Sequence, residues 1–101
     1  MTDDDADAPQ SVELPITGEL DLHAFAPRDV PGVVEEYLAA CRERGILEVR
    51  VVHGRGRGVQ RAVVRRLLAR LPCVLAFREA APASGGWGAT LVELVPPPGV
   101  D

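Results

Sequence analysis

The chain has 101 residues, of which 47% are apolar and 26% charged, and its formal net charge is −4. This length fits one small domain and excludes a two-domain enzyme, a TIM barrel or a complete dinucleotide-binding oxidoreductase. No apolar run approaches the ~20 residues that span a bilayer, and acids stand where a signal peptide would be basic, so we expect a cytoplasmic protein. Cys41 and Cys73 match no zinc or redox spacing, which predicts two free thiols.

The charges are distributed unevenly along the chain. Residues 1–21 hold seven acids and no base, and residues 1–14 have the composition of a disordered acidic leader. Residues 50–70 hold seven arginines and no acid. A local basic face attracts polyanions even on an acidic chain, because a charge acts within about one Debye length. A solvated helix face is the alternative, but such faces usually mix both signs, so we expect an anionic partner.

Six segments between residues 15 and 95 have the spacing of strands or helices. They are a strand at 16–22, a helix from Pro31 to Gly45, a strand at 46–52, a helix at 59–71, and strands at 73–79 and 89–95. Helical crossovers place the first three strands in one sheet, parallel where adjacent, and the last two strands form a hairpin. This order predicts an α/β fold, a two-layer βαβαββ sandwich, followed by a Pro-rich tail at 96–101.

The first candidate site is the sequence Leu20-Asp21-Leu22-His23. Side chains two apart on a strand face the same way, so Asp21 and His23 are expected on one side at the end of the first strand. A carboxylate beside an imidazole fixes its tautomer and raises its basicity, as general acid–base catalysis requires. The alternative is a polar strand end with a helix-capping role, and for an isolated Asp-x-His it is the commoner one.

The second candidate is the turn HGRGRG at 53–58, between a buried strand and a helix. Glycine lets the backbone approach an anion, and a helix N-terminus offers free N–H groups and a positive dipole. Arginines add donors suited to phosphate. The turn is neither a P-loop nor a good Rossmann fingerprint. The predicted phosphate-binding residues are Gly54, Arg55, Gly56, Arg57, Gly58, Arg61 and Arg65; a tight turn with solvent-facing arginines is the alternative.

The third candidate is Trp87, the only tryptophan, which three glycines flank. An exposed Trp stacks on a nucleic-acid base, whereas a Trp that covers a small core is the alternative and is slightly favoured. The sequence shows no Ser/His/Asp arrangement, no His-rich metal-ligand cluster and no Cys-based zinc spacing.

Together these segments resemble the Smr (small MutS-related) domain family over residues 16–95. The resemblance rests on LDLH at 20–23, VVHGRGRG at 51–58 and GGWGATLV at 85–92. It implies a stand-alone short form without the mismatch-repair ATPase body, and a fold similar to the C-terminal domain of translation initiation factor three. It also implies nucleic-acid binding and, as in several members, cleavage of DNA or RNA. The positions matching the family's functional motifs are Asp21, Leu22, His23, His53, Gly54, Arg55 and Gly56.

The residues and the resemblance together predict phosphodiester cleavage. His23, oriented by Asp21, would act as general base or acid, with His53 as a second proton carrier. On RNA the 2′-OH can attack without a metal. On DNA water must attack, which favours a divalent ion such as Mg²⁺ with Asp21 as its only obvious carboxylate ligand. Ala24 stands where the family usually has Gly, so the loop after the first strand is expected to take a different path, which bears on catalysis.

Two other functions remain open from the sequence. A non-catalytic nucleic-acid-binding module, acting at the ribosome or in repair, would use the same arginines and glycine turn. In such a module Asp21 and His23 would have no catalytic role. A protein-interaction domain would instead use the acidic leader to meet a basic partner. We expect a monomer that binds no membrane, with a weak dimer left open.

Overall fold

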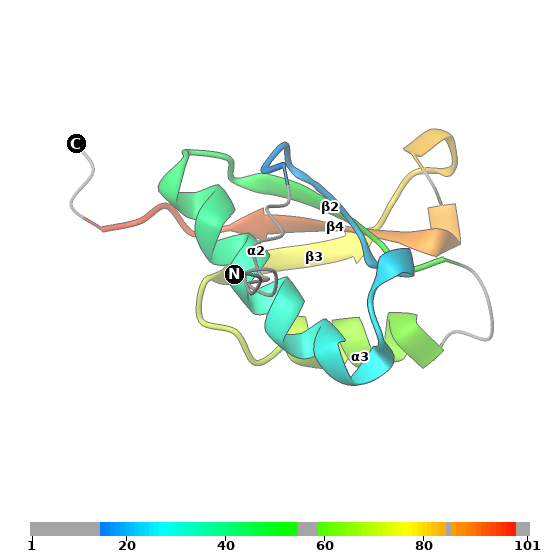
Figure 1. Cartoon of the computed structure of the whole chain (residues 1–101). Helices are drawn as coiled ribbons and strands as arrows, with labels where there is room; N and C mark the ends of the chain where they lie inside the picture. Colours follow the sequence, from blue (N-terminus) through cyan, green and yellow to red (C-terminus); the bar gives the residue numbers. More distant parts are fainter. Residues whose placement is uncertain (1–14, 55–58, 85, 99–101) are drawn as a thin grey trace, which may run out of the picture.

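The computed structural model describes residues 15–54, 59–84 and 86–98 (Figure 1). The predicted leader at 1–14, residues 55–58 of the predicted phosphate-binding turn and residues 99–101 of the tail lie outside this range.

Six main elements follow one another in the predicted βαβαββ order. They are β1 (Glu19–Asp21), α2 (Val30–Glu43), β2 (Glu48–Val52), α3 (Val59–Leu68), β3 (Val74–Glu79) and β4 (Ala89–Leu94). Short 3-10 helices connect them: η2 (Leu22–Ala24), η3 (Pro27–Asp29), η4 (Pro82–Ser84) and η5 (Gly86–Gly88). No helix in the described part is long and apolar enough to cross a membrane.

The four strands form one sheet in the order β1-β2-β4-β3. β1 and β2 are parallel, whereas β4 is antiparallel to both of its neighbours. The predictions that the first three strands share a sheet, with adjacent ones parallel, and that the last two strands form a hairpin are therefore confirmed. The sequence did not predict that β4 would insert between β2 and β3.

Both helices cover the same face of the sheet (Figure 1). Alternate residues of the central strands point into this layer, and Val49, Val51 and Val92 are completely buried there. The core is aliphatic, as the composition predicts, and Cys41 belongs to it. Cys41 and Cys73 are both free, which confirms the expectation of two unpaired thiols.

β1 is much shorter than the predicted strand at 16–22. Gly18 adopts a φ of +99°, which takes the chain out of extended geometry before Glu19. The Tyr37 hydroxyl of α2 accepts hydrogen bonds from the N–H groups of Thr17 and Gly18, at 3.2 and 3.1 Å. The same hydroxyl donates to the carbonyl of Glu19 at 2.9 Å. The hydroxyl of a buried side chain therefore satisfies backbone groups at the start of this short strand.

α2 begins and ends as the sequence predicts. Pro31 lies in its first turn, where the missing N–H removes no helical hydrogen bond. Gly45 follows the helix with a φ of +78°. The N–H groups of Gly45 and Ile46 donate to the carbonyls of Arg42 and Cys41, at 3.0 and 2.9 Å, the hydrogen-bond pair of a Schellman motif.

The face of the sheet opposite the helices carries charged side chains. Three ion pairs lie on it: Arg50–Glu19 (2.8 Å), Arg78–Glu93 (2.9 Å) and Arg78–Glu48 (3.8 Å). Arg50 alternates with the buried Val49 and Val51, so it points away from α3. The arginine-rich window at 50–70 is therefore divided between two faces of the molecule.

The two glycines of the α2 region should respond to alanine in opposite directions. At Gly45 a side chain meets open space but must adopt the left-handed conformation, so Gly45→Ala should lower the free energy of unfolding by about 1–2 kcal/mol. At Gly32, inside the first turn of α2, nothing lies within 4 Å, so Gly32→Ala should raise it by about 0.4–1 kcal/mol. Urea unfolding of the two variants measures both values. If both variants changed the free energy of unfolding equally, the Schellman geometry at Gly45 would contribute nothing to stability.

Candidate functional site

The parallel strands β1 and β2 end at the same edge of the sheet. Asp21, the last residue of β1, pairs in register with Val52, the last residue of β2. The segments that follow, η2 and the start of the glycine-rich turn, therefore leave the sheet side by side. A side chain built on Gly54 would lie 3.9 Å from Cε1 of His23. The structure thus brings together the first two sites that the sequence predicted.

Asp21 and His23 form a hydrogen-bonded pair. Asp21 caps η2: its Oδ1 accepts from the backbone N–H of His23 at 2.9 Å and lies 3.3 Å from His23 Nδ1. Asp21 and His23 lie close together, as predicted. They do so because His23 lies in the 3-10 helix η2, and not because both residues share one face of a strand. The capping role that the sequence left as an alternative is therefore also present, in the same carboxylate.

The pair is open to solvent. The side chains of His23 and Asp21 are 79% and 60% exposed. A carboxylate oxygen can only accept, so the bond to Asp21 places the proton of a neutral imidazole on Nδ1. Nε2 then carries the lone pair and points away from the carboxylate. This is the arrangement of a general base whose partner stabilises the protonated form.

His53 lies in a contrasting environment, with only 8% of the residue exposed. Its Nδ1 lies 3.1 Å from the carbonyl oxygen of Gly54, and its Nε2 lies 2.9 Å from Oγ1 of Thr90. Because the carbonyl only accepts, Nδ1 carries the proton and the Thr90 hydroxyl donates to Nε2. Burial lowers the pKa of the imidazole, the bond to Gly54 opposes that change, and the nearby Arg61 guanidinium adds to it.

This geometry favours a positioning role for His53, because both ring nitrogens are occupied inside the protein. Its assignment as a second proton carrier stays a prediction. Backbone hydrogen bonds also join the residues after β2 to the segment before β4: the carbonyl of Gly88 accepts from the N–H groups of His53 and Gly54, at 3.0 and 2.9 Å. Gly54 itself adopts a φ of +82°, which favours glycine. The start of the glycine-rich turn is thus held against β4 and the segment before it.

Reasoning from the sequence did not identify Thr90 as the hydrogen-bond partner of His53. Thr90 is completely buried on β4, on the same face as Val92 and Leu94. A signal was present, because Thr90 is the one polar residue among the inward positions of that predicted strand. The side chain of Trp87, in η5, lies outside the described part of the chain, so its role in base stacking stays a prediction.

The arginines of α3 fall into two groups. Arg61 forms an ion pair with Glu79 of β3 at 3.4 Å. The guanidinium of Arg65 lies over the ring of Phe77, 5.6 Å from its centroid. The Nη1 atom of Arg65 is buried and has no hydrogen-bond partner in the described structure. Arg66 and the following Arg70 are exposed. The predicted phosphate ligands Arg55, Gly56, Arg57 and Gly58 lie outside the described residues.

A metal ion would find few ligands here. Within residues 15–54, 59–84 and 86–98, no group of three or more His, Cys, Asp or Glu side chains is arranged to hold one. Asp21 and His23 supply two donors at most, which does not fit a resident catalytic metal of the usual three-ligand kind.

Comparison with known proteins agrees with this geometry. The family model described as Smr domain matches residues 20–95. The chain is 39% identical over 85 residues to Endonuclease MutS2 of Caldicellulosiruptor saccharolyticus and 35% identical over 78 residues to that of Thermus thermophilus. These matches cover 84% and 77% of the chain, which spans about 10% of the length of each relative.

Two solved structures are also similar. The crystal structure of the Smr domain of Thermus thermophilus MutS2 aligns with a TM-score of 0.75 and 34% identity, covering 79% of this chain and 100% of that one. The crystal structure of YdaL, a stand-alone small MutS-related protein from Escherichia coli, aligns with a TM-score of 0.72 and 27% identity, covering 88% of this chain and 72% of that one.

The lowered pKa of His53 predicts a loss of stability in mild acid. The unfolded chain takes up a proton near the ordinary pKa of about 6.5, whereas the folded chain does so only at lower pH. The unfolded state therefore binds more protons in that interval, and the free energy of unfolding should fall as the pH drops from 7.5 towards 5. Urea unfolding at each pH measures the fall.

The variant His53→Asn should be less stable at pH 7.5 by about 1–2 kcal/mol, because it loses the Thr90 bond. It should also lose the pH dependence over this range. Arg44→Gln, which changes no titrating side chain in this range, is the control and should keep the dependence. If His53→Asn kept the full pH dependence, the titrating group would not be His53.

Proposed function

Because this chain belongs to the Smr domain family, we propose that it binds nucleic acid and cleaves phosphodiester bonds as an endonuclease, with Asp21 and His23 as its catalytic residues. The observation that carries the proposal is the exposed imidazole of His23, bonded to Asp21 through Nδ1 and adjacent to Gly54 at the start of the glycine-rich turn. A phosphate bound at this turn would bring its ester bond to Nε2 of His23.

The distribution of charge supports one direction of approach for the nucleic acid. The exposed Arg66 lies on α3, the helix that follows the glycine-rich turn, and the exposed Arg70 lies in the turn after this helix. The opposite face of the sheet holds its arginines in ion pairs with carboxylates, which repel phosphate. The backbone of the bound strand would therefore run along α3 towards η2. The arginines of α3 contact phosphates and so position the strand without reading its sequence.

In the proposed reaction, Nε2 of His23 removes the proton of the attacking hydroxyl as the new P–O bond forms and the bond to the leaving oxygen breaks. Asp21 stabilises the imidazolium that results, and the arginines and backbone N–H groups of the turn stabilise the negative charge on phosphorus oxygens. RNA fits this arrangement better than DNA, because its 2′-OH is already positioned for attack and a single base can activate it. Solvent protonates the leaving oxygen.

Removing the imidazole should abolish cleavage and spare binding. Full-length protein is incubated with labelled single-stranded RNA, structured RNA and supercoiled DNA, each with EDTA or magnesium. His23→Ala should reduce the cleavage rate by about 10²–10⁴-fold, the usual contribution of a general base. Asp29→Asn, at an exposed carboxylate outside the pair, is the matched control and should cleave normally. Cleavage that survives His23→Ala at the wild-type rate rules out this catalytic assignment.

A non-catalytic binding module is the second candidate, and one observation favours it. Among the described residues, His53 is withdrawn from solvent by its bonds to Gly54 and Thr90, which leaves His23 as the one exposed imidazole. Salt-sensitive binding of RNA or DNA with no cleavage under either metal condition would establish this function in place of the endonuclease.

The exposed Arg66 of α3 and Arg70 of the turn after it should contribute to binding through charge alone. The double variant Arg66→Gln, Arg70→Gln should weaken binding to every nucleic acid tested and lower the slope of log Kd against log salt by about 1.4–1.8. Arg44→Gln, an exposed arginine at the far end of α2, should change neither quantity. Fluorescence anisotropy at four salt concentrations measures the slopes. An unchanged slope in the double variant would place the phosphate path elsewhere.

A further inference from the structure

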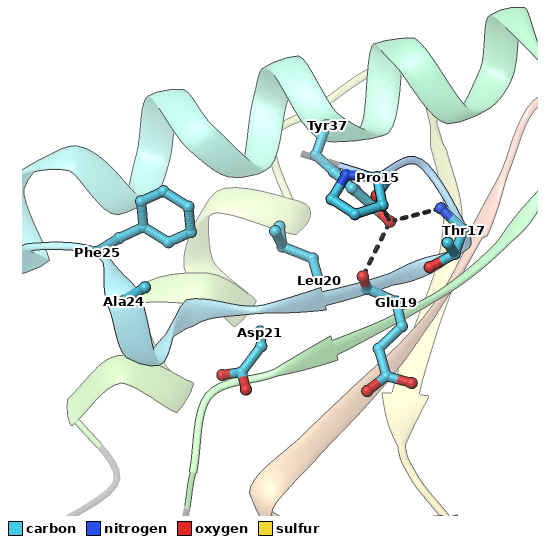
Figure 2. A pocket seen from close by; sticks show the side chains of 8 residues that line it. All are labelled: Pro15, Thr17, Glu19, Leu20, Asp21, Ala24, Phe25 and Tyr37. Atoms are coloured by element: carbon cyan, nitrogen blue, oxygen red, sulfur yellow. Dashed lines mark hydrogen bonds between the residues drawn. The ribbon is translucent and has the colours of Figure 1, made fainter. Parts of the chain in front are cut away.

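A hollow with a volume of about 270 Å³ lies between α2 and the outer edge of β1. Figure 2 shows Phe25 on one side of it, Pro15 and Tyr37 on the other, and Leu20 at the back, pointing towards α2. The volume is slightly below the ~300–1,000 Å³ of pockets that hold drug-sized ligands. The hollow therefore suits a single flat ring system.

The floor of the hollow is the outer edge of β1, which no other strand among the described residues pairs with. The N–H of Arg50 donates to the carbonyl of Gly18 at 2.7 Å, so the backbone groups of Gly18 face β2. Alternation along the strand then turns the backbone groups of Glu19 and Asp21 outward. The hydrogen bond from Tyr37 to the outward carbonyl of Glu19 agrees with this orientation. The N–H groups of Glu19 and Asp21 thus face the hollow.

The chemistry of the lining excludes a phosphate and favours an uncharged aromatic ring. No Arg, Lys or His lines the hollow, and the carboxylates of Glu19 and Asp21 point to the other side of β1 (Figure 2). Phe25 is half-buried, with part of its ring packed on the core. The walls are thus apolar and partly aromatic, and the polar groups that remain are uncharged: the hydroxyls of Thr17 and Tyr37 and backbone groups of β1. A nucleobase presents the matching surface, a flat face for stacking and acceptors at its edge.

The hollow and the proposed catalytic pair meet at the end of β1. Asp21 and Ala24, which flank Leu22 and His23 in the sequence, both line the hollow, whereas the carboxylate of Asp21 that bonds His23 points to the other side of β1 (Figure 2). A nucleic-acid strand whose phosphate lies at His23 would reach the hollow around the end of β1. This places the base of the nucleotide at His23, or of its neighbour, at the mouth of the hollow.

We propose that the hollow between α2 and β1 is a nucleobase-binding subsite, which takes up one unpaired base beside the cleaved phosphate and stacks it on Phe25. The inference rests on the proposed function, because it assumes that a nucleic-acid strand reaches His23. The subsite would contact a base, whereas the arginines contact phosphates only. A base must leave its stack to enter, so the subsite selects single-stranded or unpaired segments.

The experiment compares oligonucleotides of equal charge that differ only in their bases. Full-length protein is titrated by fluorescence anisotropy, at one salt concentration, with 2′-O-methyl octanucleotides of A, C, G or U and with an abasic octamer. At least one base should bind about tenfold more tightly than the abasic chain. Phe25→Leu, which keeps the apolar volume and loses the aromatic face, should remove most of that preference and leave the abasic affinity unchanged.

A second variant keeps the test valid if Phe25→Leu does not fold. Ala24 is exposed and lines the hollow, so Ala24→Leu should fill it without disturbing the core, and should also remove the preference. Leu71→Ala is the control, because Leu71 packs on the core and lines a different pocket, with Pro72 and Val95. It should retain the preference of the wild type.

The outcomes separate the two proposals. A preference for a base that persists in both Phe25→Leu and Ala24→Leu overturns the subsite and leaves the proposed function standing. Equal affinity of the wild type for all five octamers has the same meaning. Absence of binding to every octamer, even at low salt, overturns nucleic-acid binding and the subsite with it.

Discussion

The parallel pairing of β1 with β2 is the constraint on which the rest of this structure depends. Because Asp21 lies opposite Val52, two segments that are thirty residues apart leave the sheet at the same edge. The exposed pair Asp21–His23 and the glycine-rich turn become neighbours only through this register, and a slip by one residue would reverse the facing of every side chain in β1. A three-residue edge strand has few hydrogen bonds with which to hold such a register by itself.

Two buried polar side chains supply the missing rigidity. Tyr37 fixes the start of β1 through the backbone of Thr17, Gly18 and Glu19. His53 fixes the start of the turn after β2 through Gly54 and Thr90. Buried hydrogen bonds of this kind define one arrangement, because breaking either leaves an unpaired polar group inside the protein. The site is thus exposed at His23 and rigid at both of the segments that carry it.

The fold also separates charge that the sequence mixes. Arg50 and Arg78 are held among carboxylates on the open face of the sheet, while Arg66 and Arg70 remain exposed at the end of α3 and in the turn after it. An acidic chain therefore presents exposed arginines on the helix layer that covers the other face. The apolar hollow beside β1 adds a surface of a third kind at the edge of the sheet. In the proposed function, the phosphate, the cleaved ester bond and the base of a nucleotide would each contact a different one of these surfaces.

Much of this arrangement follows from the sequence alone. Periodicity and turn residues determine the βαβαββ order, Gly45 ends α2, and three motifs identify the family, because each of these depends on residues close together in the chain. The sequence could not show that Glu79 would meet Arg61, that Thr90 would occupy Nε2 of His53, or that Tyr37 would shorten β1. Those outcomes depend on strand order and on the packing of α2 and α3 against the sheet. Tertiary structure alone decided which histidine is buried and which is exposed, because burial depends on contacts between segments distant in sequence.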